Sequence, residues 1–133
     1  MKALGLITSF DWEFQDIEVC ERAIFTAPLG FGIDWYSGMM LDSRRPISRW
    51  EDAVVRPLGR IIGGHFIAVT GYDKRRKGGE FEMTNSWGHR WGLDGRCYIS
   101  RDDLGKLLAD QGECVMFHDA EDLDVLAARS GWK

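Results

Sequence analysis

One pattern near the middle of the chain constrains its fold more than any other. His65 follows two glycines, and an apolar run over residues 66–70 comes directly after it. A basic segment that ends in two glycines, residues 74–79, separates this run from a second one that leads to Asn85. Two runs around such a loop predict a β-hairpin, with 66–70 as a buried central strand that is apolar on both faces. Because His65 and Asn85 stand 20 residues apart on its two arms, the hairpin brings their side chains together.

A histidine held by an asparagine is suited to acid–base work. An imidazole activates a nucleophile when a third group orients it from its far nitrogen. Here the Asn85 carboxamide would hold one ring nitrogen of His65 while the other faces a cleft, and Trp87 would cover that hydrogen bond and exclude water. Composition alone favours a structural interpretation. A histidine beside an apolar strand is usually a core or rim residue, and Asn85-Ser86-Trp87-Gly88 is also a tight turn with an aromatic plug.

The remaining patterns predict an α+β fold without internal repeats or linkers. Apolar residues recur at three- and four-residue steps from Phe14 to Ile24, which indicates an amphipathic helix. Ser100 and Asp103 resemble a capping box that opens a second helix. Its leucines 104, 107 and 108 share one face. The other expected elements are strands at 29–33, 80–84, 95–99 and 114–117, a turn at 35–40, a surface loop at 42–60, and a weakly helical tail at 119–133.

Composition narrows the class of protein. The chain has 133 residues, of which 44% are hydrophobic and 29% charged, and this predicts one globular domain with a sizeable core. Its net charge of −4 gives no electrostatic case for nucleic acid or an anionic membrane. We expect neither a signal peptide nor a membrane span, and therefore a cytoplasmic or particle-associated protein. Three cysteines at unrelated spacings predict no disulfide framework.

No cofactor or metal site is expected. His89, Cys97, Cys114 and His118 could be assembled into a zinc site, but they lack a close Cys-x-x-Cys pair, so scattered ordinary residues are the simpler interpretation. The basic run at 74–77 could touch phosphate or an acidic partner surface, but a solvated hairpin tip is the usual explanation for four such residues.

The order of the motifs resembles one half of a known family. Gly63-Gly64-His65, Asn85-Ser86-Trp87-Gly88 and Trp91-Gly92, joined by short strands, are similar to the C-terminal half of papain-like cysteine peptidases. Upstream, Ala27 to Phe31 resembles the Gly-Pro-Val strand of that family, and Trp35 to Met39 resembles the following turn of bacterial and phage members.

The resemblance implies a fold and a set of site residues. The fold would be the second lobe of the family, an antiparallel sheet or half-barrel with flanking helices, over residues 1–118, with 119–133 as a C-terminal tail. His65 and Asn85 would be the catalytic pair, and Trp87 would support them.

The resemblance also implies a nucleophile that we do not find. The family's cysteine lies well upstream of its histidine, near the start of the domain, and only 64 residues precede His65 here. Cys20 falls on the inward face of the expected first helix, Cys97 lies in a short strand, and Cys114 follows the second helix. Catalytic thiols usually open a helix or lie beside an imidazolium, and none of the three opens a helix.

These observations favour a homologue that lacks its catalytic cysteine. We expect a non-catalytic binding or assembly module, for example a structural component of a phage-like particle. A protein partner, a second copy or the folded-back tail at 119–133 would cover the face around Gly30, Gly32, His65 and Trp87. The alternative is the His/Asn half of a split cysteine-type endopeptidase, whose cysteine lobe comes from another chain and which binds peptide only when complemented.

Overall fold

A computed structural model describes residues 10–14, 16–41, 44–76 and 78–117. Short helices and an antiparallel sheet make up this part of the chain. In chain order the elements are β1 (Phe10–Phe14), α1 (Ile17–Ala23), β2 (Leu29–Tyr36), the 3-10 turns η2 (Ser37–Met39) and η3 (Trp50–Ala53), β3 (Ile61–Asp73), β4 (Glu80–Thr84), β5 (Arg96–Ser100), α2 (Arg101–Ala109) and β6 (Glu113–Phe117).

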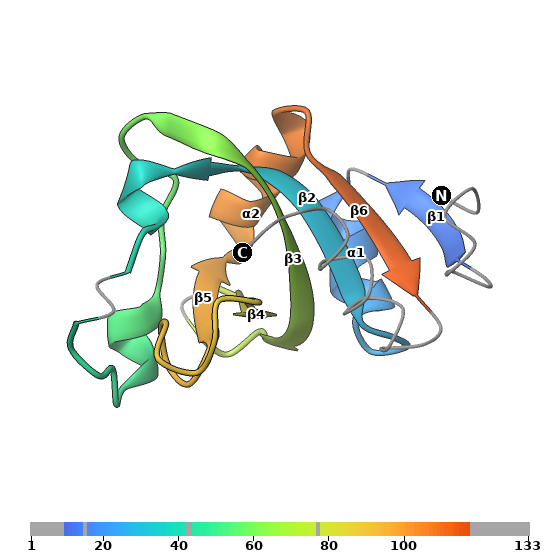
Figure 1. Cartoon of the computed structure of the whole chain (residues 1–133). Helices are drawn as coiled ribbons and strands as arrows, with labels where there is room; N and C mark the ends of the chain where they lie inside the picture. Colours follow the sequence, from blue (N-terminus) through green and yellow to red (C-terminus); the bar gives the residue numbers. More distant parts are fainter. Residues whose placement is uncertain (1–9, 15, 42–43, 77, 118–133) are drawn as a thin grey trace.

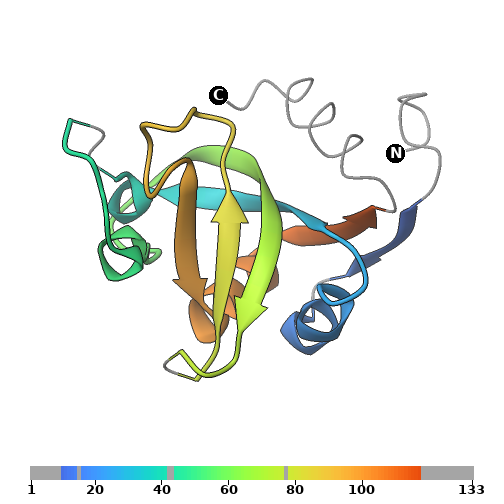
Figure 2. The same cartoon turned by 90° about the horizontal axis from the view of Figure 1, so that it is seen from below.

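The sheet has six strands in the order β1-β6-β2-β3-β4-β5, and every neighbouring pair is antiparallel. β3 is the longest strand, and it bends between two groups of strands that run in different directions (Figure 2). The curled sheet confirms the predicted α+β class, an antiparallel sheet with flanking helices. The strand predicted at 114–117 is present as β6, and it lies between β1 and β2 inside the sheet.

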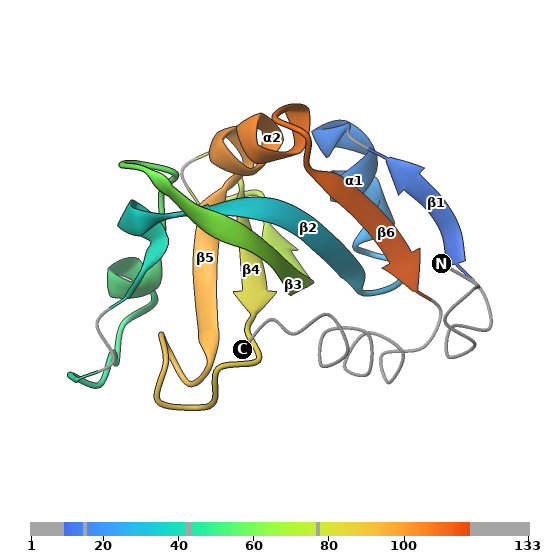
Figure 3. The same ribbon diagram turned by 45° about the horizontal axis from the view of Figure 1, so that its top comes forward.

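Both helices lie on the same side of β2 and β6 (Figure 1 and Figure 3). Asp16 caps α1, because its Oδ1 accepts the backbone N–H of Glu18 at 2.9 Å. Ser100 caps α2 in the predicted way, with its Oγ accepting the backbone N–H of Asp103 at 3.1 Å. The two helices touch where Gly105 faces Ile17: a Cβ added at Gly105 would lie 3.5 Å from the nearest Ile17 methyl carbon.

The core forms between the helices and the concave face of the sheet. In β2, Leu29, Phe31 and Ile33 are buried, within the strand predicted at 29–33. From α2, leucines 104, 107 and 108 are buried as predicted, and they pack in the same cluster as Phe81 of β4. Each fully buried side chain of this size contributes about 1.5–3 kcal/mol by leaving water.

Several element boundaries differ from the sequence predictions. The first helix begins at Ile17, not at Phe14, because residues 10–14 pair with β6 as a strand. The predicted loop at 42–60 contains η3, and Val54 bridges to Tyr98 of β5.

The hairpin strand also departs from its prediction. β3 extends well beyond residues 66–70, and only one of its faces is buried: Ile67 and Val69 are inside, whereas Thr70 is exposed. Outside these points, β4 has the predicted bounds, and β5 begins one residue later than expected.

The predicted tail at 119–133 lies outside the described residues. Among the residues described, no helix is long and apolar enough to cross a membrane.

Candidate active site

His65 lies inside β3, where Ile33 of β2 is its cross-strand partner. Sheet hydrogen bonds fix the backbone on the β2 side, and alternation along the strand places His65 on the same face as Ile67. The side chain is 3% exposed. A histidine is therefore held in a buried position by the central strand of the sheet, and not by a loop.

Asn85 directly follows the last residue of β4, the strand that pairs with β3. Its backbone N–H donates to the carbonyl of Gly95 at 2.9 Å, which closes the loop between β4 and β5 at its base. Gly92 explains the second Trp-Gly motif: its φ is +61°, and a Cβ there would lie 2.3 Å from the carbonyl oxygen of Arg96. Only glycine fits that position without moving the backbone.

The predicted hydrogen bond between the two side chains is present. Nε2 of His65 lies 3.0 Å from Oδ1 of Asn85, and Oδ1 also accepts the backbone N–H of Ser86 at 2.8 Å. Because a backbone N–H can only donate, the amide atom that it meets must be oxygen. That oxygen can only accept from His65, so Nε2 carries the ring proton. In the neutral imidazole the lone pair then lies on Nδ1, the nitrogen that can take a proton from a nucleophile.

Three tryptophans surround this pair. The ring centroid of Trp87 lies 4.8 Å from that of His65 at an interplanar angle of 35°, so the indole packs against the imidazole. Trp35 lies at the same centroid distance but at 68°. Trp91 packs edge-on against Trp87 at 5.2 Å. Burial lowers the pKa of His65, and the hydrogen bond to Asn85 opposes that change in part. The lowered pKa favours the neutral imidazole.

Hydrogen bonding does not account for the stability of this aromatic shell. Among the described residues, the indole N–H groups of Trp35, Trp87 and Trp91 and the Nδ2 of Asn85 are buried without an acceptor. Each such donor costs on the order of 1–3 kcal/mol. Aromatic packing must offset that cost, which makes the shell sensitive to the loss of any ring.

A family comparison agrees with this geometry. The model of the papain family cysteine proteases matches residues 37–118, more than half of the chain, including His65 and Asn85. The chain belongs to the papain family of cysteine proteases. No curated protein sequence matches it significantly.

Solved papain-family structures share the fold. The chain is similar to xylellain, a cysteine protease from Xylella fastidiosa, with 23% identity, a TM-score of 0.62, and coverage of 84% of this chain and 40% of that one. Bromelain from Ananas comosus, in complex with the E64 inhibitor, is 17% identical with a TM-score of 0.56, and the match covers 77% of this chain and 46% of bromelain. The clostridial cysteine protease Cwp84 is 21% identical with a TM-score of 0.53, and the match covers 80% of this chain and 28% of Cwp84. The chain therefore spans less than half the length of these structures.

The three cysteines lie elsewhere in this papain-family fold. Cys20 in α1, Cys97 in β5 and Cys114 in β6 are all free and fully buried. Burial raises the pKa of the Cys97 thiol. It also raises the pKa of Cys114, with a further increase from the neighbouring Cys20 thiol. All three belong to the hydrophobic core, so the prediction that Cys20 is a small core residue is confirmed.

A shallow cavity of about 290 Å³ lies beside His65. Gly32 and Gly64 contribute no side chains to its wall, and Asp34 and Glu113 contribute carboxyl groups from β2 and β6. A peptide backbone could approach the imidazole from this side, because glycines leave room for close contact.

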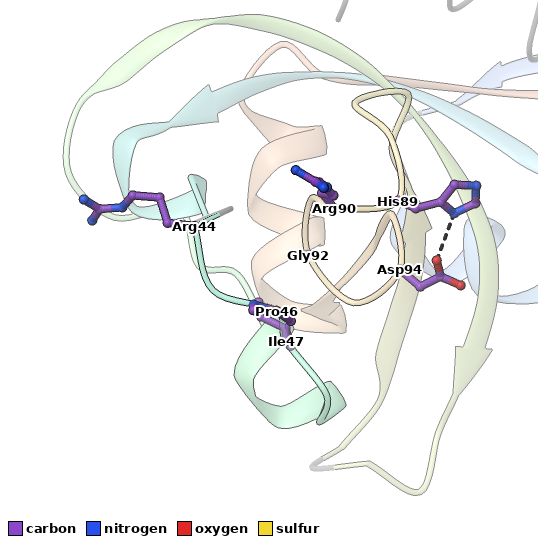
Figure 4. A pocket seen from close by; sticks show the side chains of 7 residues that line it. All are labelled: Arg44, Pro46, Ile47, His89, Arg90, Gly92 and Asp94. Carbon is purple, nitrogen blue, oxygen red and sulfur yellow. Dashed lines mark hydrogen bonds and ion pairs between the residues drawn. The ribbon is translucent and has the colours of Figure 1, made fainter.

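Another cavity, of about 430 Å³, lies near the loop between β4 and β5. Figure 4 shows that Arg44 extends away from Arg90, and that His89 lies on the far side of the loop, where its Nδ1 is 2.9 Å from Asp94. The charged side chains that line this cavity point in different directions, so they do not form a binding site for one ligand.

His89, Cys97 and Cys114 form no metal-binding cluster within the described part of the chain. Within the described ranges no three His, Cys, Asp or Glu side chains could hold a metal ion, and His118 lies outside them. The basic run is partly structural, since Arg75 pairs with Asp73 at 3.2 Å and the Arg76 guanidinium stacks 4.1 Å over the ring of Trp50.

Trp35 is the site residue that sequence reasoning missed. The sequence predicts a turn at 35–40, whereas β2 continues through Tyr36. The alternation of Leu29, Phe31, Ile33 and Trp35 would have placed it on the inner face of a longer strand, had the strand been extended by two residues.

Proposed function

We propose that the described part of the chain acts on its own as a non-catalytic, protein-binding module of papain-family descent. The observation that carries the proposal is the burial of all three thiols in the core, at 0% exposure for Cys20, Cys97 and Cys114. Covalent peptide hydrolysis requires a thiolate that meets the substrate carbonyl carbon. A thiol with a raised pKa inside the core offers neither the charge nor the access.

Exposed apolar residues that precede His65 in the chain support a binding role. Met40, Leu58, Ile61 and Ile62 are each about half exposed, from 47% to 54%. Their segments run side by side, because the backbone N–H of Gly38 donates to the carbonyl of Leu58 at 2.8 Å. Contiguous exposed apolar patches mark protein interaction surfaces, and these segments bring several large apolar residues to one region of the chain. We propose that a protein partner or a second copy covers them, together with the face around His65.

Self-association can be tested directly. Sedimentation of the purified chain should show a species larger than the monomer, or a monomer that binds dye for exposed apolar surface. Ile62→Lys should reduce either effect, whereas Thr70→Lys, an exposed substitution elsewhere on β3, should not. A parent protein that is monomeric and binds no dye would contradict this proposal.

A second candidate function is favoured by the intact pair at the site. With Nε2 of His65 bonded to Asn85 at 3.0 Å, Nδ1 has the lone pair that a general base needs. The chain would then be the His/Asn half of a cysteine-type endopeptidase, whose cysteine comes from another chain.

One experiment separates the two functions. The purified chain is treated with a thiol-directed peptidase probe and a peptide substrate, first alone and then with a cysteine-bearing papain-family lobe added in trans. The first proposal expects no labelling and no turnover in either case. Turnover only in the complemented sample would establish the second candidate. In that sample His65→Ala should abolish turnover and His89→Ala should leave it unchanged, since His89 is an exposed loop residue paired with Asp94.

Labelling of the isolated chain at one of its own cysteines would contradict both functions, provided that His65→Ala removes it. Association with a phage particle, suggested by the likeness of residues 35–39 to a turn of phage members, stays a prediction. Detection of the chain in purified particles would test it.

A further inference from the structure

A cysteine attaches the first helix to the core. Cys20 is the one residue of α1 that is fully buried, and the helix is only seven residues long. Its other apolar contacts come from Ile17, Ala23 and Ile24, which are partly buried against the core. Helices this short are marginal without tertiary packing. α1 is therefore an element that can open locally before the rest of the fold does.

The path of the chain places this cysteine over β6. Phe14, the last residue of β1, pairs with Cys114 of β6, and Cys20 follows Phe14 by six residues. α1 lies on the core side of β2 and β6 (Figure 1 and Figure 3). Cys114 faces the same core, with 0% exposure. The two thiols meet there, and the Cys20 thiol is a hydrogen-bonding neighbour of Cys114.

We propose that Cys20 and Cys114 are a redox-sensitive pair, which a mild oxidant converts into a disulfide that fixes α1 against β6. The oxidant is hydrogen peroxide or a small-molecule disulfide. Both cysteines are free thiols in this structure. Cys97 of β5 is the third thiol, and burial alone raises its pKa, without a contribution from another cysteine. The chain thus contains one adjacent pair and one separate thiol.

The reaction with peroxide balances with these two side chains. The thiolate of one cysteine attacks a peroxide oxygen, the O–O bond breaks, and a sulfenic acid and one water form. The thiolate of the other cysteine attacks that sulfur, and the second oxygen leaves as water. Two thiols and one peroxide give one disulfide and two waters, with two electrons passing from sulfur to peroxide. A small-molecule disulfide gives the same product by exchange and is released as two thiols.

Oxidation requires α1 to open. Both sulfurs are fully buried, and burial raises the pKa of Cys114, so the closed state offers little thiolate. When α1 detaches, Cys20 leaves the core and Cys114 loses its cover. An ion pair between Glu21 of α1 and Arg101 of α2 opposes this opening. The rate of disulfide formation should therefore follow the population in which α1 is detached.

The cross-link joins distant parts of the chain. Its two cysteines are more than 90 residues apart, and disulfides that close long loops restrict the unfolded chain most. Glu113 directly precedes Cys114 and lines the cavity beside His65. The disulfide therefore also restrains the strand that forms one wall of this cavity.

The test is oxidation of the purified chain by hydrogen peroxide, and in a separate sample by oxidised glutathione. Peptide mapping by mass spectrometry without reduction should find Cys20 linked to Cys114, with the loss of two hydrogens. The Tm should rise by about 10 °C and return after reduction with dithiothreitol. Cys97→Ser should behave like the parent, whereas Cys20→Ser and Cys114→Ser should show neither the link nor the rise.

The dependence on opening has its own pair of variants. Glu21→Gln removes the ion pair that holds α1 and should speed disulfide formation several-fold. Glu51→Gln removes a comparable exposed pair with Arg49 at η3 and should leave the rate unchanged. Both variants keep all three thiols, so this comparison decides the matter should the serine variants fail to fold.

Several results would overturn the proposal. These are links to Cys97 in equal yield, links only between two copies of the chain, over-oxidised single thiols without a disulfide, and equal rates in Glu21→Gln and Glu51→Gln. Because none of these readouts uses a peptide substrate or a partner, the proposal and the two candidate functions can fail independently.

Discussion

Removal of the Asn85 side chain is the sharpest test of how the site is held together. In Asn85→Ala, Oδ1 disappears, and with it the bonds to His65 Nε2 at 3.0 Å and to the Ser86 backbone N–H at 2.8 Å. Each neutral hydrogen bond contributes about 0.5–1.5 kcal/mol, and a buried donor left without an acceptor costs about 1–3 kcal/mol. The loss is moderated because Nδ2 of Asn85 already lacks an acceptor among the described residues.

We therefore expect Asn85→Ala to lower the free energy of unfolding by about 2–3 kcal/mol, measured by urea denaturation. For a chain of this length that corresponds to a fall in Tm of roughly 8–12 °C. Asn85→Asp is the matched control. It keeps an acceptor oxygen for both donors and should cost less, while its carboxylate raises the pKa of His65. A cost below about 0.5 kcal/mol for Asn85→Ala would refute the proposed role of these bonds.

Three further predictions concern other parts of the fold. Because burial lowers the pKa of His65 in the folded state, the unfolded state binds that proton more tightly. The contribution of His65 to the free energy of unfolding should therefore be complete above pH about 6.5 and decrease as the pH falls below it. Urea denaturation of His65→Gln over the same pH range should show a smaller decrease. Ser100→Ala removes the cap of α2 and should cost about 1 kcal/mol by the same assay, whereas a cost near zero would mean that water replaces the cap. Cys97 and Cys114 should resist a thiol reagent at pH about 8 in the folded protein and react once urea unfolds it, because burial raises both pKa values above the ordinary thiol range; fast reaction in the native state would contradict their burial.

Local patterns predicted the elements whose stability is local. The β4 strand and the loop before it follow from apolar runs around glycines, and the structure has β4 at the predicted residues. The start of α2 follows from Ser100, whose hydroxyl accepts the N–H of Asp103. In both cases the stabilising contact joins residues that are close in sequence, so the pattern contains the information.

Elements that depend on distant partners were not predictable in this way. β1 is a strand because residues 10–14 pair with β6, more than 90 residues later in the chain. Val54 joins β5 through Tyr98, which a polar, proline-bearing stretch does not reveal. The position of β6 between β1 and β2 is likewise a property of the whole sheet.

The candidate site shows the same division. His65 and Asn85 were predictable because one hairpin carries both, and Trp87 because it follows Asn85 by two residues. Trp35 enters only through the register between β2 and β3, which puts it opposite Gly63. A cross-strand neighbour has no fixed spacing in sequence, so the second wall of the imidazole site becomes visible only in three dimensions.

The way the pair is held also bears on its chemistry. The hairpin, the Ser86 backbone N–H and the two indoles fix His65 and Asn85 whether or not a thiol is present, so both candidate functions expect the same hydrogen bond. The two candidate functions differ in the charge that they predict for His65. A thiolate beside Nδ1 would stabilise the imidazolium and raise the pKa of His65, whereas in the isolated chain burial lowers it. Binding of a protein partner that only covers the site would exclude more water and lower this pKa further. The direction in which the titration of His65 moves when a partner binds therefore distinguishes a completed catalytic centre from a covered one.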